Sequence, residues 1–255
     1  RFETIGLLNG AFPDACIEVR EHLSSGSNGI AYREMAADKS SGEQIAPSSH
    51  VRGLAAAAAA RALRPDIIHV SSLIEGYEEG AALSPYPRDI VSGAIRTATV
   101  YDLIPLVFSG KYLSDRDYGA WYRGAIAHYA SFDLLFAISE ATRRDLIEHL
   151  GIDPDRVINI SAAVDSRFRH LRDAERYRDA IARKLKLTQP FILYTGGADH
   201  RKNLHGAIEA FSRLPDDVRS SRKLAIVRRM DRTTEASLLE HARQCGLDPS
   251  ALVLT

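Results

Sequence analysis

A nine-residue segment, GGADHRKNL, combines a glycine turn with two adjacent cations and a helix start. It follows the apolar run FILYT, which predicts a buried strand. Gly196 and Gly197 lack a Cβ, so the backbone can turn tightly there and approach a ligand closely. Arg201 and Lys202 come just before Asn203, a residue type that favours the first position of a helix. Two cations beside the positive end of a helix predict a diphosphate-binding site.

The alternative interpretation is a solvated Arg–Lys pair beside an ordinary turn, and the residues alone leave both interpretations open. The segment differs from the known phosphate-binding motifs, because neither GxxxxGK[ST] nor GxGxxG occurs. A nucleotide would therefore be held by a different arrangement.

Two neighbouring residues in the first half of the chain are candidates for the acceptor chemistry of a transferase. Asp102 follows an apolar run and could orient or deprotonate an acceptor hydroxyl, or bind the acceptor. It could equally form an Asx turn before Pro105. Tyr101 has an ordinary pKa near 10, which makes it a poor base at neutral pH, so hydrogen bonding or stacking suits it better.

Further acceptor-side candidates surround the apolar run at 67–70. His69 is either a core histidine, which we favour, or an acceptor-site residue, and Ser71 and Ser72 follow it directly. Other conspicuous side chains have ordinary interpretations. The aromatic residues along 115–129 are expected in a core rather than in a sugar platform (Tyr118, Trp121, Tyr122, Tyr129). Ser139 is expected to cap a helix, and Arg143 and Arg144 are expected on a solvated face.

Composition excludes several functional classes. Lys plus Arg total 33 and Asp plus Glu total 33, so the basic excess of a nucleic-acid binder is missing. Neither HExxH nor a Cys/His cluster occurs, so we expect no metal site and no cofactor. The longest apolar stretch, 54–60, is far shorter than the roughly 20 residues of a membrane span. We expect a cytoplasmic protein, with peripheral contact to the inner membrane face as one option.

The elements that must position these residues alternate between strands and helices, which predicts an α/β fold with parallel sheets. The expected strands are 67–70, 96–101, 134–138, 157–160, 191–194, 224–227 and 252–254, and the expected helices are 51–63, 115–129, 140–150, 204–214 and 234–245. We predict a first domain over 1–168, a charge-rich linker helix over 169–188 and the start of a second domain over 189–255.

The GG-x-x-x-RKN segment resembles the donor-site motif of retaining glycosyltransferase family 4, the group 1 glycosyltransferases of GT-B fold. TVYDLIPLVFSGKYL, AISEATRRDL and VINISAAVDSRF resemble further family segments in the expected order. Tyr101 stands where the family often has His, and Ala163 where it has Gly. The family's acidic EX7E segment, which would follow the GG-x-x-x-RKN segment, does not occur after it in this chain.

This resemblance implies two facing Rossmann-like domains, the second one truncated, and a hexosyl transfer with retention in polysaccharide biosynthesis. The implied donor is a nucleotide sugar, and GDP-mannose is expected only because members of the family often use it. The implied acceptor is a glycan or a lipid-linked glycan, and neither a metal ion nor nucleic acid takes part. A non-catalytic nucleotide-sugar-binding module on the same scaffold stays open as an alternative. A Rossmann dehydrogenase is disfavoured because its glycine fingerprint is missing.

Overall fold

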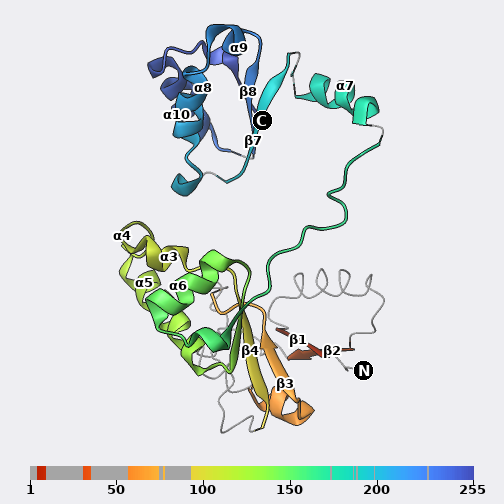
Figure 1. Ribbon diagram of the computed structural model, residues 1–255, viewed down its shortest axis with the longest axis vertical. Coiled ribbons are helices and arrows are strands. Elements are labelled where there is room, and N and C mark those ends of the chain that lie inside the picture. The colour runs from red at the N-terminus through yellow and green to blue at the C-terminus, as the bar shows by residue number, and fades with distance from the viewer. Residues whose placement is uncertain are drawn as a thin grey trace, which may run out of the picture. The chain divides into compact units, whose positions relative to one another are not determined.

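The computed structural model describes residues 5–9, 31–35, 57–74, 77, 93–172, 174–185, 187, 189–197, 199–228 and 230–255. The chain divides into two compact units, Arg1–Val164 and Asp165–Thr255 (Figure 1). Among the strands of the described residues, none of the first unit pairs with one of the second.

The main sheet of the first unit contains four parallel strands in sequence order. They are β3 (Ile67–Val70), β4 (Ile95–Val100), β5 (Leu134–Ala137) and β6 (Val157–Asn159). All four lie within a residue or two of the predicted runs. Because the strands are parallel, the residues that follow them share one edge of the sheet, called here the carboxyl edge.

Helices cover one face of this sheet. The principal ones are α5 (Arg116–Ala127), which continues into the short η1 (His128–Ser131), and α6 (Glu140–Leu150). Both lie on the same side of β4 in Figure 1. Their apolar stripes pack on Ala98, Val100 and Leu135 to form the core of the unit. Asp115 caps α5 and Ser139 caps α6, each accepting a bond from a backbone N–H in the first turn.

The structure also contains elements that the sequence analysis missed. Two parallel strands, β1 (Ile5–Asn9) and β2 (Ala31–Met35), form a separate pair. Two one-turn helices, α3 (Ile104–Val107) and α4 (Ser109–Tyr112), follow β4. Pro105 occupies the first turn of α3, where the missing N–H costs nothing.

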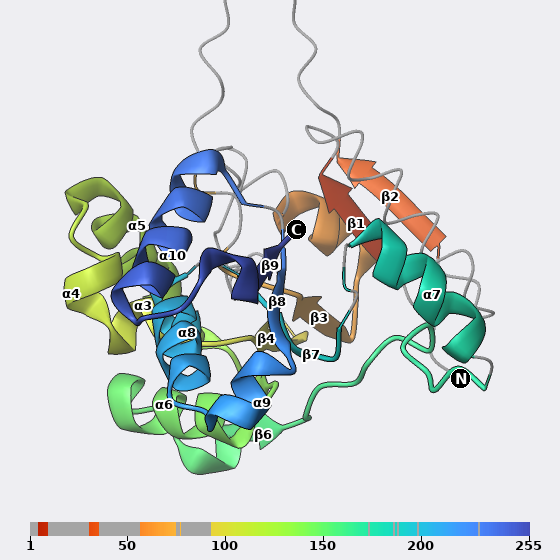
Figure 2. The same ribbon diagram turned by 90° about the horizontal axis from the view of Figure 1, so that it is seen from above.

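The second unit holds three parallel strands in the order β7 (Phe191–Thr195), β8 (Lys223–Val227) and β9 (Leu252–Leu254). The helices α8 (Leu204–Ser212) and α10 (Arg232–Gln244) lie on the same side of β8 (Figure 2). They bury an apolar core that includes Ile208, Phe211, Ile226 and Leu238. The short α9 (Asp216–Ser220) leads into β8.

The helix α7 (Ala174–Lys184) falls inside the segment predicted as a linker helix, and it belongs to the second unit. The domain limits at 168 and 188 stay predictions. Within the described residues, no helix is long and apolar enough to cross a membrane.

Candidate functional site

The predicted diphosphate segment lies at the carboxyl end of β7 and forms one compact turn. After the two glycines, the 3-10 helix η3 (His200–Lys202) leads directly into α8. Asp199 begins η3, and its Oδ1 accepts from the backbone N–H of Arg201 at 2.9 Å. The same oxygen accepts from Arg201 Nε, also at 2.9 Å. These two hydrogen bonds to one carboxylate oxygen fix the position of the Arg201 guanidinium beside Asp199.

Tyr194 ties the strand end to the cationic turn. Its hydroxyl donates to the backbone carbonyl of Lys202 at 3.0 Å. A Cβ on Gly196 would lie 3.0 Å from that hydroxyl, so the glycine leaves room for it. We expected the two glycines to allow a tight turn, but neither Gly196 nor Gly197 has a positive φ. At Gly196 the structure therefore shows close packing against the tyrosine and no left-handed backbone.

Asn203 caps α8 as predicted, and it does so from an unusual backbone conformation. Its Oδ1 accepts from Gly206 N–H at 3.1 Å, while its own φ of 49° is left-handed. Asn tolerates this region better than most residues. A Cβ on Gly206 would meet the Asn203 side chain at 2.3 to 2.7 Å, so this cap requires a glycine three residues later.

The turn therefore presents a positive surface before a helix of nine residues. Lys202 is exposed and, within the described residues, forms no ion pair, whereas Arg201 is paired with Asp199. Such a combination of ammonium, guanidinium and helix N-terminus suits an anion. The Asp199 carboxylate lowers the net positive charge, so Lys202 carries the larger part of the expected attraction.

In the first unit, four predicted residues meet at the carboxyl edge of the sheet. Ser71 and Ser72 follow β3, and Tyr101 and Asp102 follow β4, the strand paired with it. Ser72 Oγ accepts from the N–H of Ile74 at 3.4 Å. Asp102 Oδ1 accepts from the N–H of Ile104 at 3.0 Å, which is the Asx turn considered from the sequence. Tyr101 is 48% exposed, as a residue that contacts a substrate must be.

His69 is not the core histidine that we favoured. The residue is exposed on the sheet face opposite α5 and α6. Its Nδ1 lies 2.8 Å from Thr97 Oγ1 and its Nε2 lies 3.1 Å from Thr99 Oγ1. The ring also stacks on Phe136 at 5.7 Å. Although the residue as a whole is exposed, Phe136 and the threonines cover part of its ring. This partial burial lowers the pKa of His69, so a neutral imidazole that forms hydrogen bonds with the two threonines is favoured.

The reason for this misplacement is the alternation of side chains along a strand. Ile68 faces the buried side, so His69 must face the other. The face of the sheet that α5 and α6 cover could not be deduced from the apolar run IIHV alone.

The aromatic residues of α5 divide into two groups. Tyr122 and Tyr129 are buried in the core, as predicted. Tyr118 and Trp121 are partly buried, pack against that core at its margin and lie near Tyr77. Both follow the Asp115 cap closely, and the first turns of a helix after a parallel strand lie at the carboxyl edge.

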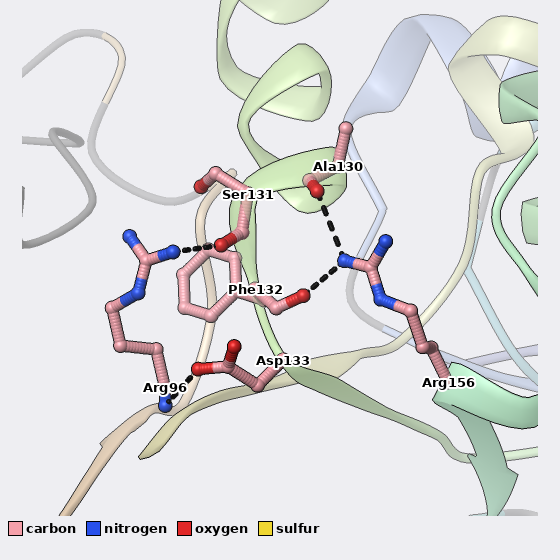
Figure 3. A pocket seen from close by; sticks show the side chains of 6 residues that line it. All are labelled: Arg96, Ala130, Ser131, Phe132, Asp133 and Arg156. Atoms are coloured by element: carbon pink, nitrogen blue, oxygen red, sulfur yellow. Dashed lines mark hydrogen bonds between the residues drawn. The ribbon is translucent and has the colours of Figure 1, made fainter. Parts of the chain in front are cut away.

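A hollow at the opposite edge of the same sheet is lined by two arginines (Figure 3). Arg156 donates to the backbone carbonyls of Ala130 and Phe132, and Arg96 donates to that of Ser131. These carbonyls belong to the end of η1, where helical partners run out. The arginines therefore satisfy the unpaired carbonyls at the end of a helix. They lie far from the carboxyl ends of the strands, where ligands bind in α/β sheets.

Within the described residues, no group of three or more His, Cys, Asp or Glu side chains could hold a metal ion. The geometry so far consists of an anion-suited turn after β7 and a polar, partly aromatic edge after β3 and β4.

The family model of Glycosyltransferase Family 4 matches residues 31–168, more than half of the chain. The chain belongs to glycosyltransferase family 4. The matched range contains all five predicted acceptor-side residues. The cationic turn after β7 lies beyond it, so its assignment depends on the resemblance of the RKN segment and on the geometry described above.

Curated relatives of this family-4 chain include the serotype-specific mannosyltransferase WbdA of Escherichia coli. One WbdA sequence is 29% identical over 263 residues, which cover 98% of this chain and 31% of WbdA. Another is 30% identical over 239 residues, covering 89% of this chain and 29% of the relative. The chain thus spans about three tenths of the length of the curated relatives it matches.

Solved structures resemble the chain in fold. A glycosyltransferase from Rickettsia africae covers all of this chain with a TM-score of 0.60 at 17% identity, over 68% of its own length. Anabaena Alr3699/HepE, solved with UDP and glucose, matches 92% of this chain and 58% of its own with a TM-score of 0.57 at 14% identity. The predicted α/β class with parallel sheets of GT-B type is confirmed.

Proposed function

We propose that this family-4 chain forms part of a glycosyltransferase that moves a hexose from a nucleotide sugar to a glycan acceptor during polysaccharide synthesis. The observation that carries the proposal is the similarity to mannosyltransferase WbdA along 98% of this chain. Mannose is therefore the proposed sugar and GDP-mannose the proposed donor. A nucleotide-sugar donor also fits the cytoplasmic location expected from the sequence.

The cationic turn after β7 is the proposed site of the donor diphosphate. During glycosyl transfer, negative charge grows on the departing diphosphate while positive charge grows at the anomeric carbon. Fixed cations near the leaving group stabilise this transition state more than the ground state. Lys202, Arg201 and the N-terminus of α8 would supply that charge without a metal ion.

The carboxyl edge of the first unit is the proposed acceptor side. Asp102 would orient the attacking hydroxyl, and Tyr101 would bind the acceptor, while His69, Ser71 and Ser72 are subsidiary candidates. We further propose retention of the anomeric configuration, with a leaving-phosphate oxygen assisting the acceptor hydroxyl. In that mechanism no strong protein base is required, which suits an Asp102 already bonded to a backbone N–H.

The proposal is tested by incubating the purified protein with GDP-mannose or UDP-glucose and a mannose oligosaccharide. Mass spectrometry should find an acceptor one hexose heavier and an equal amount of nucleoside diphosphate. If the protein binds the donor and yields neither product, the non-catalytic binding module becomes the better description.

Chelation provides a second prediction for the same assay. With EDTA present, the rate of transfer should stay within about twofold of the untreated rate, because protein cations rather than a metal stabilise the diphosphate. Complete loss of transfer, restored by adding a divalent ion, would overturn the metal-independent part of the proposal.

A further inference from the structure

Three aromatic rings from different parts of the first unit gather in one cluster. The ring of Tyr77 lies 5.0 Å from that of Trp121 and 5.2 Å from that of Tyr118, between centroids. Tyr118 and Trp121 lie 5.6 Å apart at an interplanar angle of 30°. Tyr77 is 38% exposed, and the other two rings are partly buried. We call these three residues the aromatic platform.

The topology places the aromatic platform at the carboxyl edge of the sheet. Because α5 connects the parallel strands β4 and β5, it begins at the carboxyl edge and ends at the opposite one. Tyr118 and Trp121, three residues apart, share one helix face near that beginning. Tyr77 belongs to the segment that leaves the end of β3. The platform therefore shares an edge with the residues that follow β3 and β4.

Electrostatics indicate that a carboxylate lies beside the aromatic platform. Burial raises the pKa of the Tyr118 hydroxyl, and the negative charge of Asp102 raises it further. The pKa of Tyr122, which contacts Tyr118 from the core side, is raised by burial and by the same carboxylate. A charge that acts on both hydroxyls must be near the junction of platform and core.

The core side of the aromatic platform is rigid. Tyr122 is fully buried, and its ring lies 6.1 Å from that of Tyr118. Asp115 Oδ1 accepts from Tyr118 N–H at 2.8 Å, so the helix cap fixes the backbone of the platform itself. Rings held in this way lose little conformational freedom when a ligand stacks on them.

We propose that the aromatic platform of Tyr77, Tyr118 and Trp121 binds a sugar ring of the acceptor, with Asp102 contacting the hydroxyl groups of that sugar. The apolar C–H face of a pyranose matches an aromatic surface, and its hydroxyls match a carboxylate and two phenols. A carboxylate has about four lone-pair sites, so the Asx turn of Asp102 leaves capacity for such hydroxyls.

A hydrocarbon chain fits this position less well than a sugar does. Covering Asp102 and the tyrosine hydroxyls with hydrocarbon would remove them from water without replacing the lost hydrogen bonds, which is costly. A sugar supplies polar and apolar surface together. The inference rests on the proposed function, because it assumes that the carboxyl edge of the first unit holds an acceptor.

The chain offers a direct probe, since Trp121 is its single tryptophan. Tryptophan emission should change saturably when mannotriose is added without donor, because a sugar stacked on the platform excludes water from the indole. Tyr77→Ala should weaken mannotriose binding by about two- to tenfold, the loss typical of one aromatic contact. Tyr77→Phe keeps the ring and should weaken binding less.

Two controls make failures distinguishable. Tyr177→Ala removes a tyrosine of α7 that is 51% exposed, against 38% for Tyr77, and should leave mannotriose affinity unchanged. Calorimetric titration with GDP should give one affinity for wild type and Tyr77→Ala, because the donor site lies in the other unit. If the wild-type protein does not bind GDP at all, that result would instead count against the proposed function.

Two results would overturn the aromatic platform. One is equal mannotriose affinity in wild type and Tyr77→Ala. The other is an emission change caused by polyprenyl phosphate in detergent micelles but not by mannotriose, which would assign the rings to a lipid.

Discussion

Asn203 combines two requirements at one position of the candidate donor site. It holds the left-handed backbone that joins η3 to α8, and its side chain caps α8. Few residue types meet both requirements, and Asp is the closest substitute because it tolerates the same conformation and accepts the same bond. The two substitutions Asn203→Ala and Asn203→Asp therefore separate folding from anion binding.

Asn203→Ala should lower the free energy of unfolding of the second unit by about 1–3 kcal/mol, through loss of the cap and strain at positive φ. Asn203→Asp should keep stability within about 1 kcal/mol of wild type while weakening GDP binding, because it adds a negative charge beside Lys202. Urea unfolding followed by circular dichroism, with parallel GDP titration, measures both. Stronger GDP binding by Asn203→Asp would contradict an anion site at this turn.

Arginines at the junctions between elements donate hydrogen bonds to backbone carbonyls, a role that their local sequence does not reveal. Arg143 and Arg144 both looked like members of a solvated face. In the structure, Arg143 Nε donates to Val157 O at 3.0 Å and its guanidinium also donates to Pro154 O at 3.2 Å. Arg144 is exposed, as predicted. Arg143 thus fastens α6 to the start of β6, and the original interpretation of this residue was wrong.

The neighbouring pair gives a matched comparison. Arg143→Met should destabilise the first unit by about 1–2 kcal/mol, because two carbonyls lose their partners. Arg144→Met should change stability by less than about 0.5 kcal/mol. Urea unfolding followed by Trp121 emission reports on this unit specifically. Equal effects of the two substitutions would show that the contacts of Arg143 contribute nothing.

Periodicity predicted most of the elements, because strands such as β8 and helices such as α6 have uninterrupted patterns with clear caps. It failed where neighbouring elements decide the outcome. The exposed position of His69 depends on which sheet face the helices cover, and the platform at Tyr77 depends on a segment brought to α5 by the fold. Both are long-range consequences that a local pattern does not contain.

The candidate donor site was more predictable than the candidate acceptor side. The RKN turn is continuous in sequence, so Lys202 and the Asn203 cap could be placed before the structure was known. Two details could not: the Asp199 carboxylate that binds Arg201, and the tyrosine for which Gly196 leaves room. Side-chain rotamers determine these contacts, and several rotamers are compatible with the same sequence.

Across the whole molecule, membership of family 4 and the parallel sheets of both units are consistent with a glycosyltransferase of GT-B fold. The proposed acceptor edge lies after β3 and β4 in the first unit, and the proposed anion-binding turn lies after β7 in the second. The central claim is that this turn recognises the diphosphate of a nucleotide-sugar donor. The same Arg–Lys dipeptide occurs at Arg183 and Lys184, so the chain provides its own control for a test of that claim.

The most direct measurement is calorimetric titration of GDP, UDP and guanosine into wild type and into the double variant Arg201→Ala, Lys202→Ala. The control is Arg183→Ala, Lys184→Ala, which removes the same dipeptide from the exposed end of α7. We expect the Arg201→Ala, Lys202→Ala variant to bind diphosphate about tenfold or more weakly, most strongly so at low ionic strength, with hardly any change in guanosine binding. The control should bind like wild type. Equal diphosphate affinity in all three proteins would contradict a diphosphate site at this turn and leave Arg201 and Lys202 as two cations on a solvated turn.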